Sequence, residues 1–252
     1  MRNKFDDLKE VIIGNLDVLV VTETKLDSTF PSEQFRIDGY CLYGIDRNSN
    51  GGGVSIYVRN DLASRNLSTL VNNTDLEGIF IEINLRKKKW LLYGGYNNKK
   101  QNIAKYLCEL GKLLDNFLSK YDNVLLVGDF NSETSESRMN EFCDVYDLKN
   151  LIKENTCFKN PLNPSCIDLM LTNKIRSFQN SQTLEIGLSD HHKLTLTVLK
   201  VFVPKQTPTT IKYRDYKSYD SRLFQEELDK RLQAVDNNFI CYDTFQHILW
   251  IY

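Results

Sequence analysis

The stretch that most constrains the fold is a run of apolar residues that ends in two polar side chains. Residues 124–127 (VLLV) have the composition of a buried strand, and Gly128, Asp129, Phe130 and Asn131 follow directly. Since side chains alternate along extended backbone, Asp129 and Asn131 lie on one side and Phe130 on the other. Such a pair either caps a turn or helps to form a site for a cation, a water molecule or a phosphate oxygen. The rest of the chain favours a site.

A helix predicted directly before this strand indicates a layered α/β fold. Apolar residues recur at helical spacing over residues 101–119, so this helix leads into the buried strand. The same patterns predict helices over residues 4–13 and 133–146, and strands over residues 17–22, 40–45, 54–59, 77–85, 90–96, 166–172 and 193–203. Residues 86–89 (RKKK) are expected to form a hairpin turn. Residues 204–252 are expected to form a linker and a tail with helices at 218–235 and 239–250.

Carboxylates and histidines lie where other predicted strands meet loops. Glu23 ends the apolar strand at 17–22, where it is either a surface residue or part of a site. Asp168 is the lone carboxylate of an apolar strand, so it needs a partner. His191 and His192 precede the last strand, and such a pair is either structural or catalytic. His191 with Asp168 and Asp129 would supply an acid–base group, its orienting partner and a water activator.

Charge and cysteine usage narrow the class of protein. The net charge is −1, so charge alone does not predict tight, salt-driven binding of nucleic acid. No apolar run approaches the roughly 18 residues of a membrane helix, so no membrane association is expected. The six cysteines are scattered without a CxxC pair, which is typical of reduced thiols in an intracellular protein, whether nuclear or cytoplasmic. The oligomeric state is not indicated.

Five motifs occur in an order that points to a known superfamily. They are DVLVVTETKLD, GGGVSIYVR, VLLVGDFNSE, SCIDLMLTN and GLSDHHK. Together they resemble the endonuclease–exonuclease–phosphatase (DNase I-like) superfamily. The motif sequences most resemble those of the endonuclease domain of LINE-type non-LTR retrotransposons. The resemblance covers residues 1–203. It implies an α/β (α+β) fold: a four-layer sandwich of two mixed sheets flanked by helices.

The resemblance also implies a role for each polar residue of the shared motifs. Glu23 resembles the ligand of the divalent metal, and Asp190 resembles a second acidic residue near it. Mg²⁺ is the expected ion, with Mn²⁺ as an alternative. Asp129 resembles the group that orients or deprotonates the attacking water. Asn131 resembles the phosphate contact beside it.

Three further residues complete the implied site. His191 resembles the residue that stabilises charge developing on phosphorus or acts as the acid–base group, and Asp168 resembles its orienting partner. Tyr96 resembles the tyrosine that contacts the scissile phosphate, although Asn97-Asn98-Lys99-Lys100 follows it where relatives often carry prolines. His192 lies outside the shared pattern and is interpreted as a bystander.

The implied function is that of a Mg²⁺-dependent endonuclease that nicks target DNA for a mobile element. The parent element would carry a reverse transcriptase downstream of the tail. Two alternatives stay open: a phosphatase or phosphodiesterase of the superfamily that acts on a small substrate, and a catalytically weak or inactive remnant. Relatives carry one more apolar strand before the helix at residues 4–13. The resemblance therefore predicts that this chain lacks the first strand of the fold, with weak activity as the consequence.

Overall fold

The fold was analysed in a computed structural model, which describes residues 1, 4–27, 29–48, 51–68, 76–98, 102–189, 192–201 and 219–233. The chain divides into two compact units, Met1–Gln206 and Thr207–Tyr252. The predicted boundary at residue 203 falls among residues 202–218, outside these ranges, and stays a prediction. In the second unit the structure describes α4 (Ser221–Gln233), within the helix expected at 218–235, whereas the helix expected at 239–250 lies outside the described residues.

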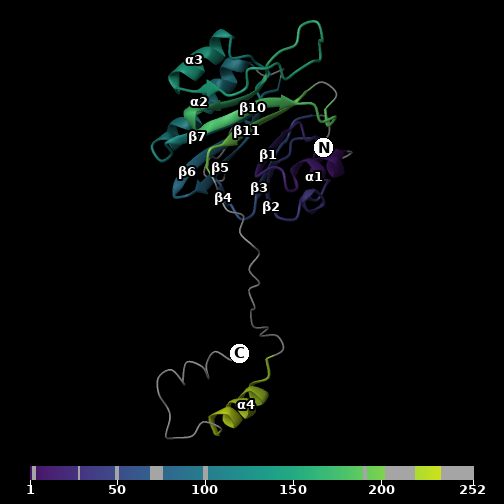
Figure 1. Ribbon diagram of the computed structural model, residues 1–252, viewed down its shortest axis with the longest axis vertical. Coiled ribbons are helices and arrows are strands. Elements are labelled where there is room, and N and C mark those ends of the chain that lie inside the picture. The colour runs from purple at the N-terminus through teal and green to yellow at the C-terminus, as the bar shows by residue number, and fades with distance from the viewer. Residues whose placement is uncertain are drawn as a thin grey trace. The chain divides into compact units, whose positions relative to one another are not determined.

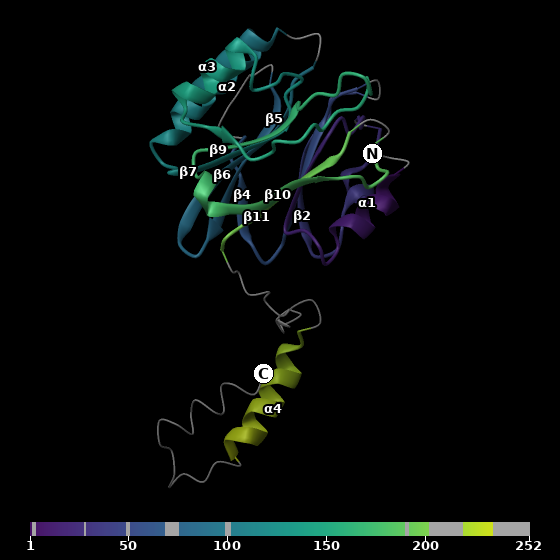
Figure 2. The same cartoon turned by 45° about the horizontal axis from the view of Figure 1, so that its top comes forward.

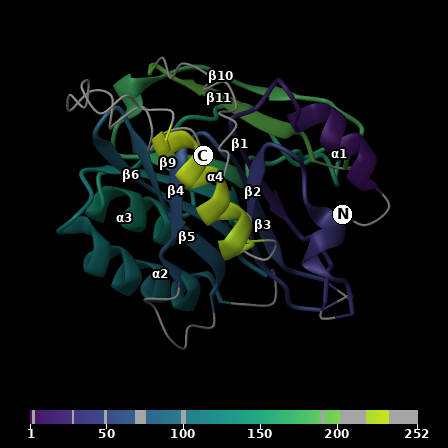
Figure 3. The same cartoon turned by 90° about the horizontal axis from the view of Figure 1, so that it is seen from below.

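The first unit has four layers, as predicted (Figures 1 and 3). Two helices cover one face of a six-stranded sheet, a smaller sheet packs on its other face, and a third helix covers the smaller sheet. In chain order the elements are α1 (Phe5–Ile12), β1 (Val18–Thr22), η2 (Ser32–Phe35), β2 (Tyr40–Ile45), β3 (Val54–Arg59), β4 (Ala63–Asn66), β5 (Glu77–Leu85), β6 (Lys88–Tyr96), α2 (Ile103–Leu118), β7 (Asn123–Asp129), α3 (Ser137–Val145), β8 (Lys149–Asn150), β9 (Asp168–Thr172), η4 (Ile175–Ser177), β10 (Phe178–Leu184) and β11 (Leu194–Leu199).

The large sheet has the strand order β4-β5-β6-β7-β9-β8, and only β6 and β7 are parallel among its pairs. This parallel pair requires a crossover, which α2 provides. The Asn102 side chain caps α2 by accepting a hydrogen bond from the Ala104 amide at 2.8 Å. Leu107, Leu110 and Leu114 of α2 are buried against this sheet. The crossover thus places the end of β7 in the middle of the sheet.

The second sheet consists of two antiparallel pieces within the described residues, whereas a mixed sheet was predicted. One piece has the order β1-β3-β2, and the other is the β10–β11 ribbon. Figure 2 shows the two strands of the ribbon, drawn in green, side by side. The strand β10 was not expected, because its sequence (FQNSQTL) is mostly polar and most of its residues stay exposed or half-buried. Pairing with β11, not burial, makes it a strand.

Two local predictions are corrected by the backbone. The turn expected at residues 86–89 is shorter: Arg86 and Lys87 turn the chain with φ of 47° and 67°, and Lys88 already belongs to β6. Two positive φ values match the right-handed twist of a two-residue hairpin. The helix expected from residue 133 begins at Ser137. Before it, Glu133 accepts a hydrogen bond from the Cys166 amide at 3.0 Å, which anchors this segment as a loop.

Candidate active site

Three of the predicted site residues form a row across neighbouring strands. In the register of the large sheet, Asp129 at the end of β7 pairs with Tyr96 of β6 on one side and with Asp168 of β9 on the other. The Phe130 amide donates to the Ile167 carbonyl at 3.0 Å, so the next pair, Asp129 and Asp168, is of the non-hydrogen-bonded type. Directly opposed side chains approach most closely in such a pair. The sheet therefore holds two carboxylates side by side.

The turn after β7 is shaped by Gly128 and by hydrogen bonds within the motif. A Cβ atom on Gly128 would lie 1.8 Å from the carbonyl oxygen of Gly95, so β6 and β7 can pair here only with glycine. Phe130 is fully buried in the core under α2 and α3. Asn131 adopts a φ of 48°, and its amide donates to Asp129 Oδ1 at 2.9 Å. The turn thus fixes the Asp129 carboxylate.

Asn97 is a site residue that the sequence analysis missed. It is only 2% exposed, its amide donates to the Asp129 carbonyl at 2.8 Å, and its side-chain Nδ2 donates to the Phe130 carbonyl at 2.9 Å. In return Asn131 Nδ2 donates to the Asn97 carbonyl at 2.7 Å. These reciprocal bonds clamp the turn after β7 to the end of β6. The available signal was its position directly after Tyr96, at a strand end.

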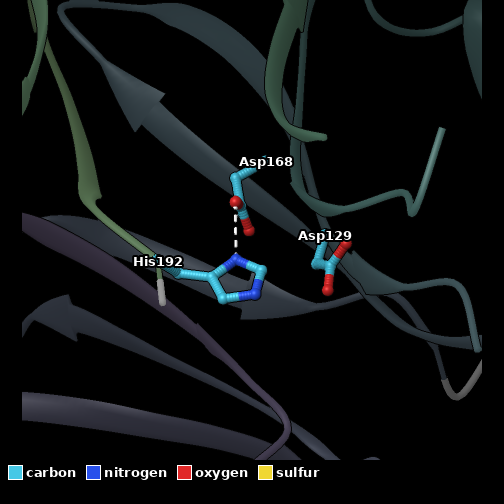
Figure 4. A group of neighbouring side chains, drawn as sticks. All are labelled: Asp129, Asp168 and His192. Carbon is cyan, nitrogen blue, oxygen red and sulfur yellow. Dashed lines mark hydrogen bonds and ion pairs between the residues drawn. The ribbon is translucent and has the colours of Figure 1, made fainter. Parts of the chain in front are cut away.

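Among the described residues the histidine next to Asp168 is His192, which the sequence analysis interpreted as a bystander. His192 Nδ1 lies 2.9 Å from Asp168 Oδ2, as Figure 4 shows, and its Nε2 lies 3.6 Å from Cys157 Sγ. A backbone bridge between Cys157 and His192 fixes the register of this segment. His191 and Asp190 lie outside the described residues. This register accompanies the contact of His192 with Asp168.

The environment of this cluster raises the pKa values of Asp129 and His192. Burial, followed by the repulsion of Asp168, raises the pKa of Asp129 from 3.8 to about 7. The hydrogen bond to Asp168 raises the pKa of His192 above 6.5. Asp129 therefore changes its charge near neutral pH, and His192 favours the charged imidazolium form.

Glu23 and Tyr96 meet between the two sheets. Glu23 follows β1 with a φ of 51°, and its carboxylate accepts a hydrogen bond from the Tyr96 hydroxyl. Burial, together with this carboxylate, raises the pKa of Tyr96, so the hydroxyl keeps its proton. Two predicted site residues from different sheets are thus in direct contact. Glu23 also borders the same cavity as Asp129, Asp168 and His192.

The chain is similar to known proteins in sequence and in fold. The sequence profile described as the Endonuclease/Exonuclease/phosphatase family matches residues 2–191, about three quarters of the chain. The chain belongs to this family. The comparison with curated protein sequences found no match.

Solved structures share the fold of the Endonuclease/Exonuclease/phosphatase family. One is the endonuclease domain of TRAS1, a telomere-specific non-LTR retrotransposon, at 14% identity and a TM-score of 0.60 over 79% of this chain and 92% of that one. Another is the 3′ phosphatase NExo from Neisseria bound to a product DNA hairpin, at 14% identity and 0.58 over 78% and 94%. The catalytic domain of human Nocturnin has 15% identity and 0.56 over 78% and 86%.

The family is typically dependent on divalent metals, and this chain contains a candidate acidic metal site. Asp129, Asp168 and His192 each offer one ligand atom, and these atoms lie within 4.8 Å of one another. This set differs from the predicted pair, Glu23 and Asp190, of which Asp190 lies outside the described residues. The two opposed carboxylates of this set fit a hard divalent cation, because they supply oxygen ligands and their mutual repulsion would be relieved by positive charge. His192 in its charged form donates hydrogen bonds from both ring nitrogens and does not bind a metal.

Proposed function

We propose that this protein is a Mg²⁺-dependent phosphodiesterase that nicks DNA, in the manner of a retrotransposon endonuclease. The observation that carries the proposal is the Asp129–Asp168–His192 cluster, in which burial and a neighbouring carboxylate set the Asp129 pKa to about 7. A general base is most effective when its pKa lies near the working pH. Members of the family are hydrolases that act on phosphodiester bonds.

Each side chain of the cluster has a separate role in the proposed hydrolysis. Asp129 accepts the proton of the attacking water. Asp168 keeps His192 charged and oriented through Nδ1. His192 then donates from Nε2 to a phosphate oxygen, in place of its 3.6 Å contact with Cys157 Sγ, and stabilises the negative charge that develops there. When bound, the divalent metal supplies positive charge to the phosphate and lowers the pKa of water.

Tyr96, Asn131 and Glu23 have supporting roles in this proposal. The Tyr96 hydroxyl has a single proton, which it donates to Glu23 in the structure, and in the proposed complex it donates this proton to a phosphate oxygen instead. Asn131 uses one side-chain N–H on the Asn97 carbonyl, which leaves the second N–H for the substrate. Glu23, whose carboxylate borders the same cavity, would help to hold the metal.

DNA is the proposed substrate because two similar structures are a retrotransposon endonuclease domain and a phosphatase bound to DNA. The chain has a net charge of −1, so binding depends on local contacts and not on a basic field. The second candidate is a phosphomonoester, which is favoured by the likeness to a 3′ phosphatase whose bound product is a DNA hairpin. The two candidates predict different products from the same site.

Plasmid relaxation tests the proposal. Supercoiled plasmid should become nicked with Mg²⁺ and stay supercoiled with EDTA, while p-nitrophenyl phosphate and a 3′-phosphorylated oligonucleotide should not be hydrolysed. Asp129→Asn should lower the nicking rate by about two to four orders of magnitude. Asp122→Asn is the matched control, because Asp122 is exposed and directly precedes the opposite end of β7. Equal nicking by both variants, or hydrolysis of small phosphoesters alone, would contradict the proposal.

A further inference from the structure

Lysines and arginines gather at the end of the large sheet that is opposite to the candidate active site. Tyr96, Asp129 and Asp168 lie at one end of β6, β7 and β9, and the register brings the other ends of these strands together. Residues 85–89, 119–123, 173–176 and 199–201 meet there. We call this surface the basic end. Its cations are Arg86, Lys87, Lys88, Lys89, Lys120, Lys174, Arg176 and Lys200.

Hydrogen bonds hold the segments that precede β7 and follow β9 against the start of β6. Asn123 Nδ2 donates to the Lys89 carbonyl at 3.0 Å. Asn173 Nδ2 donates to the Asp122 carbonyl at 3.1 Å. The cations of residues 85–89, 119–123 and 173–176 are therefore presented by neighbouring strand ends, which lie about 4.8 Å apart in a sheet.

The end of β11 joins the same surface. The Lys200 amide donates to the Ser177 carbonyl at 2.8 Å, and Lys200 Nζ donates to the Arg176 carbonyl at 3.1 Å. The rings of Trp90 and Phe178 are in contact, with 5.6 Å between their centroids. This contact attaches the start of β10 to the start of β6, so the cations of all four segments belong to one surface.

Acidic side chains offset only part of this positive charge. Asp122 is the one acidic residue within the four segments. The nearby Glu82 is only 4% exposed, and its carboxylate lies 3.0 Å from Arg65 Nη2 and 3.8 Å from Lys89 Nζ. Lys174 is half-buried, and the other cations of the basic end are exposed to solvent. The basic end therefore attracts anions from solution.

The basic end lies far from the candidate active site. β7 runs from Asn123 to Asp129 and rises about 3.3 Å per residue, so its two ends are about 20 Å apart. The catalytic end carries carboxylates, and the basic end carries cations. The net charge of −1 thus combines two ends of opposite charge, and an anion at the basic end does not occupy the candidate active site.

We propose that the basic end binds the phosphate backbone of a nucleic-acid segment that lies outside the candidate active site. Lysines that follow one another across strand ends form a row of point charges, which suits a regularly charged chain and carries no sequence preference. A membrane surface would need an apolar face to insert. Ile175 is the one large apolar side chain that is exposed within these segments. The binding does not depend on the proposed nuclease activity.

Salt dependence of binding tests the proposal. The full chain is titrated in EDTA with a fluorescein-labelled twelve-base single strand and with a twelve-base-pair duplex, and anisotropy is measured between 50 and 200 mM salt. The logarithm of the binding constant should fall linearly with the logarithm of the salt concentration, because cations that contact phosphates release counterions. The strand form that binds more tightly identifies the preferred kind of nucleic acid.

Two variants from separate segments locate the binding surface. Lys88→Gln and Arg176→Gln should each lower the steepness of the salt dependence by about 0.9 with the duplex, or about 0.7 with the single strand. Together they should weaken binding at 50 mM salt by at least about tenfold. Lys112→Gln is the matched control, because Lys112 is exposed on α2 outside the basic end and its loss changes the net charge equally. It should bind as the parent does.

Several results would overturn the proposal, and none of them depends on DNA cleavage. Equal losses in all three variants would show that only the net charge matters. A peptide of twelve glutamates that binds as tightly as the oligonucleotides would show a surface for any acidic chain. Absence of binding at 50 mM salt, or binding to phosphatidylserine vesicles alone, would also exclude a nucleic-acid surface. If the oligonucleotides bind as proposed and plasmid nicking still fails, only the proposed function is wrong.

Discussion

At the scale of single residues, the choice between two adjacent histidines defines the candidate site. His192 contacts Asp168, and the Cys157 thiol lies against the other nitrogen of its ring. We predict that His192→Gln lowers plasmid nicking by about two to four orders of magnitude, because the charged donor beside the phosphate is lost. His191→Gln should lower it by less than about threefold, since the observed contact with Asp168 is made by His192. The nicking rates of both variants, compared at equal folded fraction, show which histidine is needed for nicking. The reverse ranking would restore His191 to the catalytic role.

The protonation of Asp129 leads to a second prediction at this scale. Its pKa is raised from 3.8 to about 7, so between these pH values the folded protein holds a proton that the unfolded chain has lost. The free energy of unfolding should therefore fall as pH rises through this window, by an amount on the order of 3–4 kcal/mol. The raised pKa of His192 acts in the same direction, because its contribution is lost as pH rises through the folded-state value.

Urea unfolding in EDTA at pH 5 and pH 8 measures this effect. Asp129→Asn should be more stable than the parent at pH 8 and should show a much weaker dependence on pH. Asp122→Asn should keep the pH dependence of the parent. A parent protein whose stability is the same at both pH values would show that the Asp129 pKa is not raised.

At the scale of elements, the ends of β6 and β7 act as one unit. Gly128 lies against the Gly95 carbonyl, and Asn97 connects the two strand ends by three hydrogen bonds. We predict that Gly128→Ala separates the strands and lowers the free energy of unfolding by about 3 kcal/mol or more, as overpacking of a closed contact does. The control is Gly44→Ala in β2, where an added Cβ would lie 3.8 Å from its nearest neighbour and should cost less than about 1 kcal/mol. Equilibrium unfolding in urea compares the two. Equal losses would show that the contact at Gly128 relaxes freely.

At the scale of the whole molecule, Met1–Gln206 forms one compact unit and Thr207–Tyr252 another. The three apolar core clusters all lie in the first unit. We predict that Met1–Gln206 alone unfolds cooperatively, with a melting temperature within about 2 °C of the full chain. Differential scanning calorimetry of both proteins measures this. A non-cooperative or strongly shifted transition of the shorter protein would show that the second unit is needed for the fold.

None of the helices that the structure describes is long and apolar enough to span a membrane.

Most helices and strands were predictable from the sequence, because their patterns are local. The stripe of α2, the apolar run of β7 and the alternation of β5 each identify an element without knowledge of its neighbours. The motifs also identified the family and the four-layer fold. The strand β10 escaped prediction because its residues are mostly polar and its strand character comes from pairing with β11.

The composition of the candidate site could be predicted from the sequence only in part. The motifs placed Glu23, Tyr96 and Asp129 at strand ends and Asp168 within the strand expected at 166–172. The structure brings these four residues to one region between the sheets. Only the tertiary structure decided that Asp129 opposes Asp168 and that His192 pairs with Asp168. Local sequence sets which residues become strands, whereas strand register between distant segments sets which side chains meet, and a shift of one residue exchanges the two histidines.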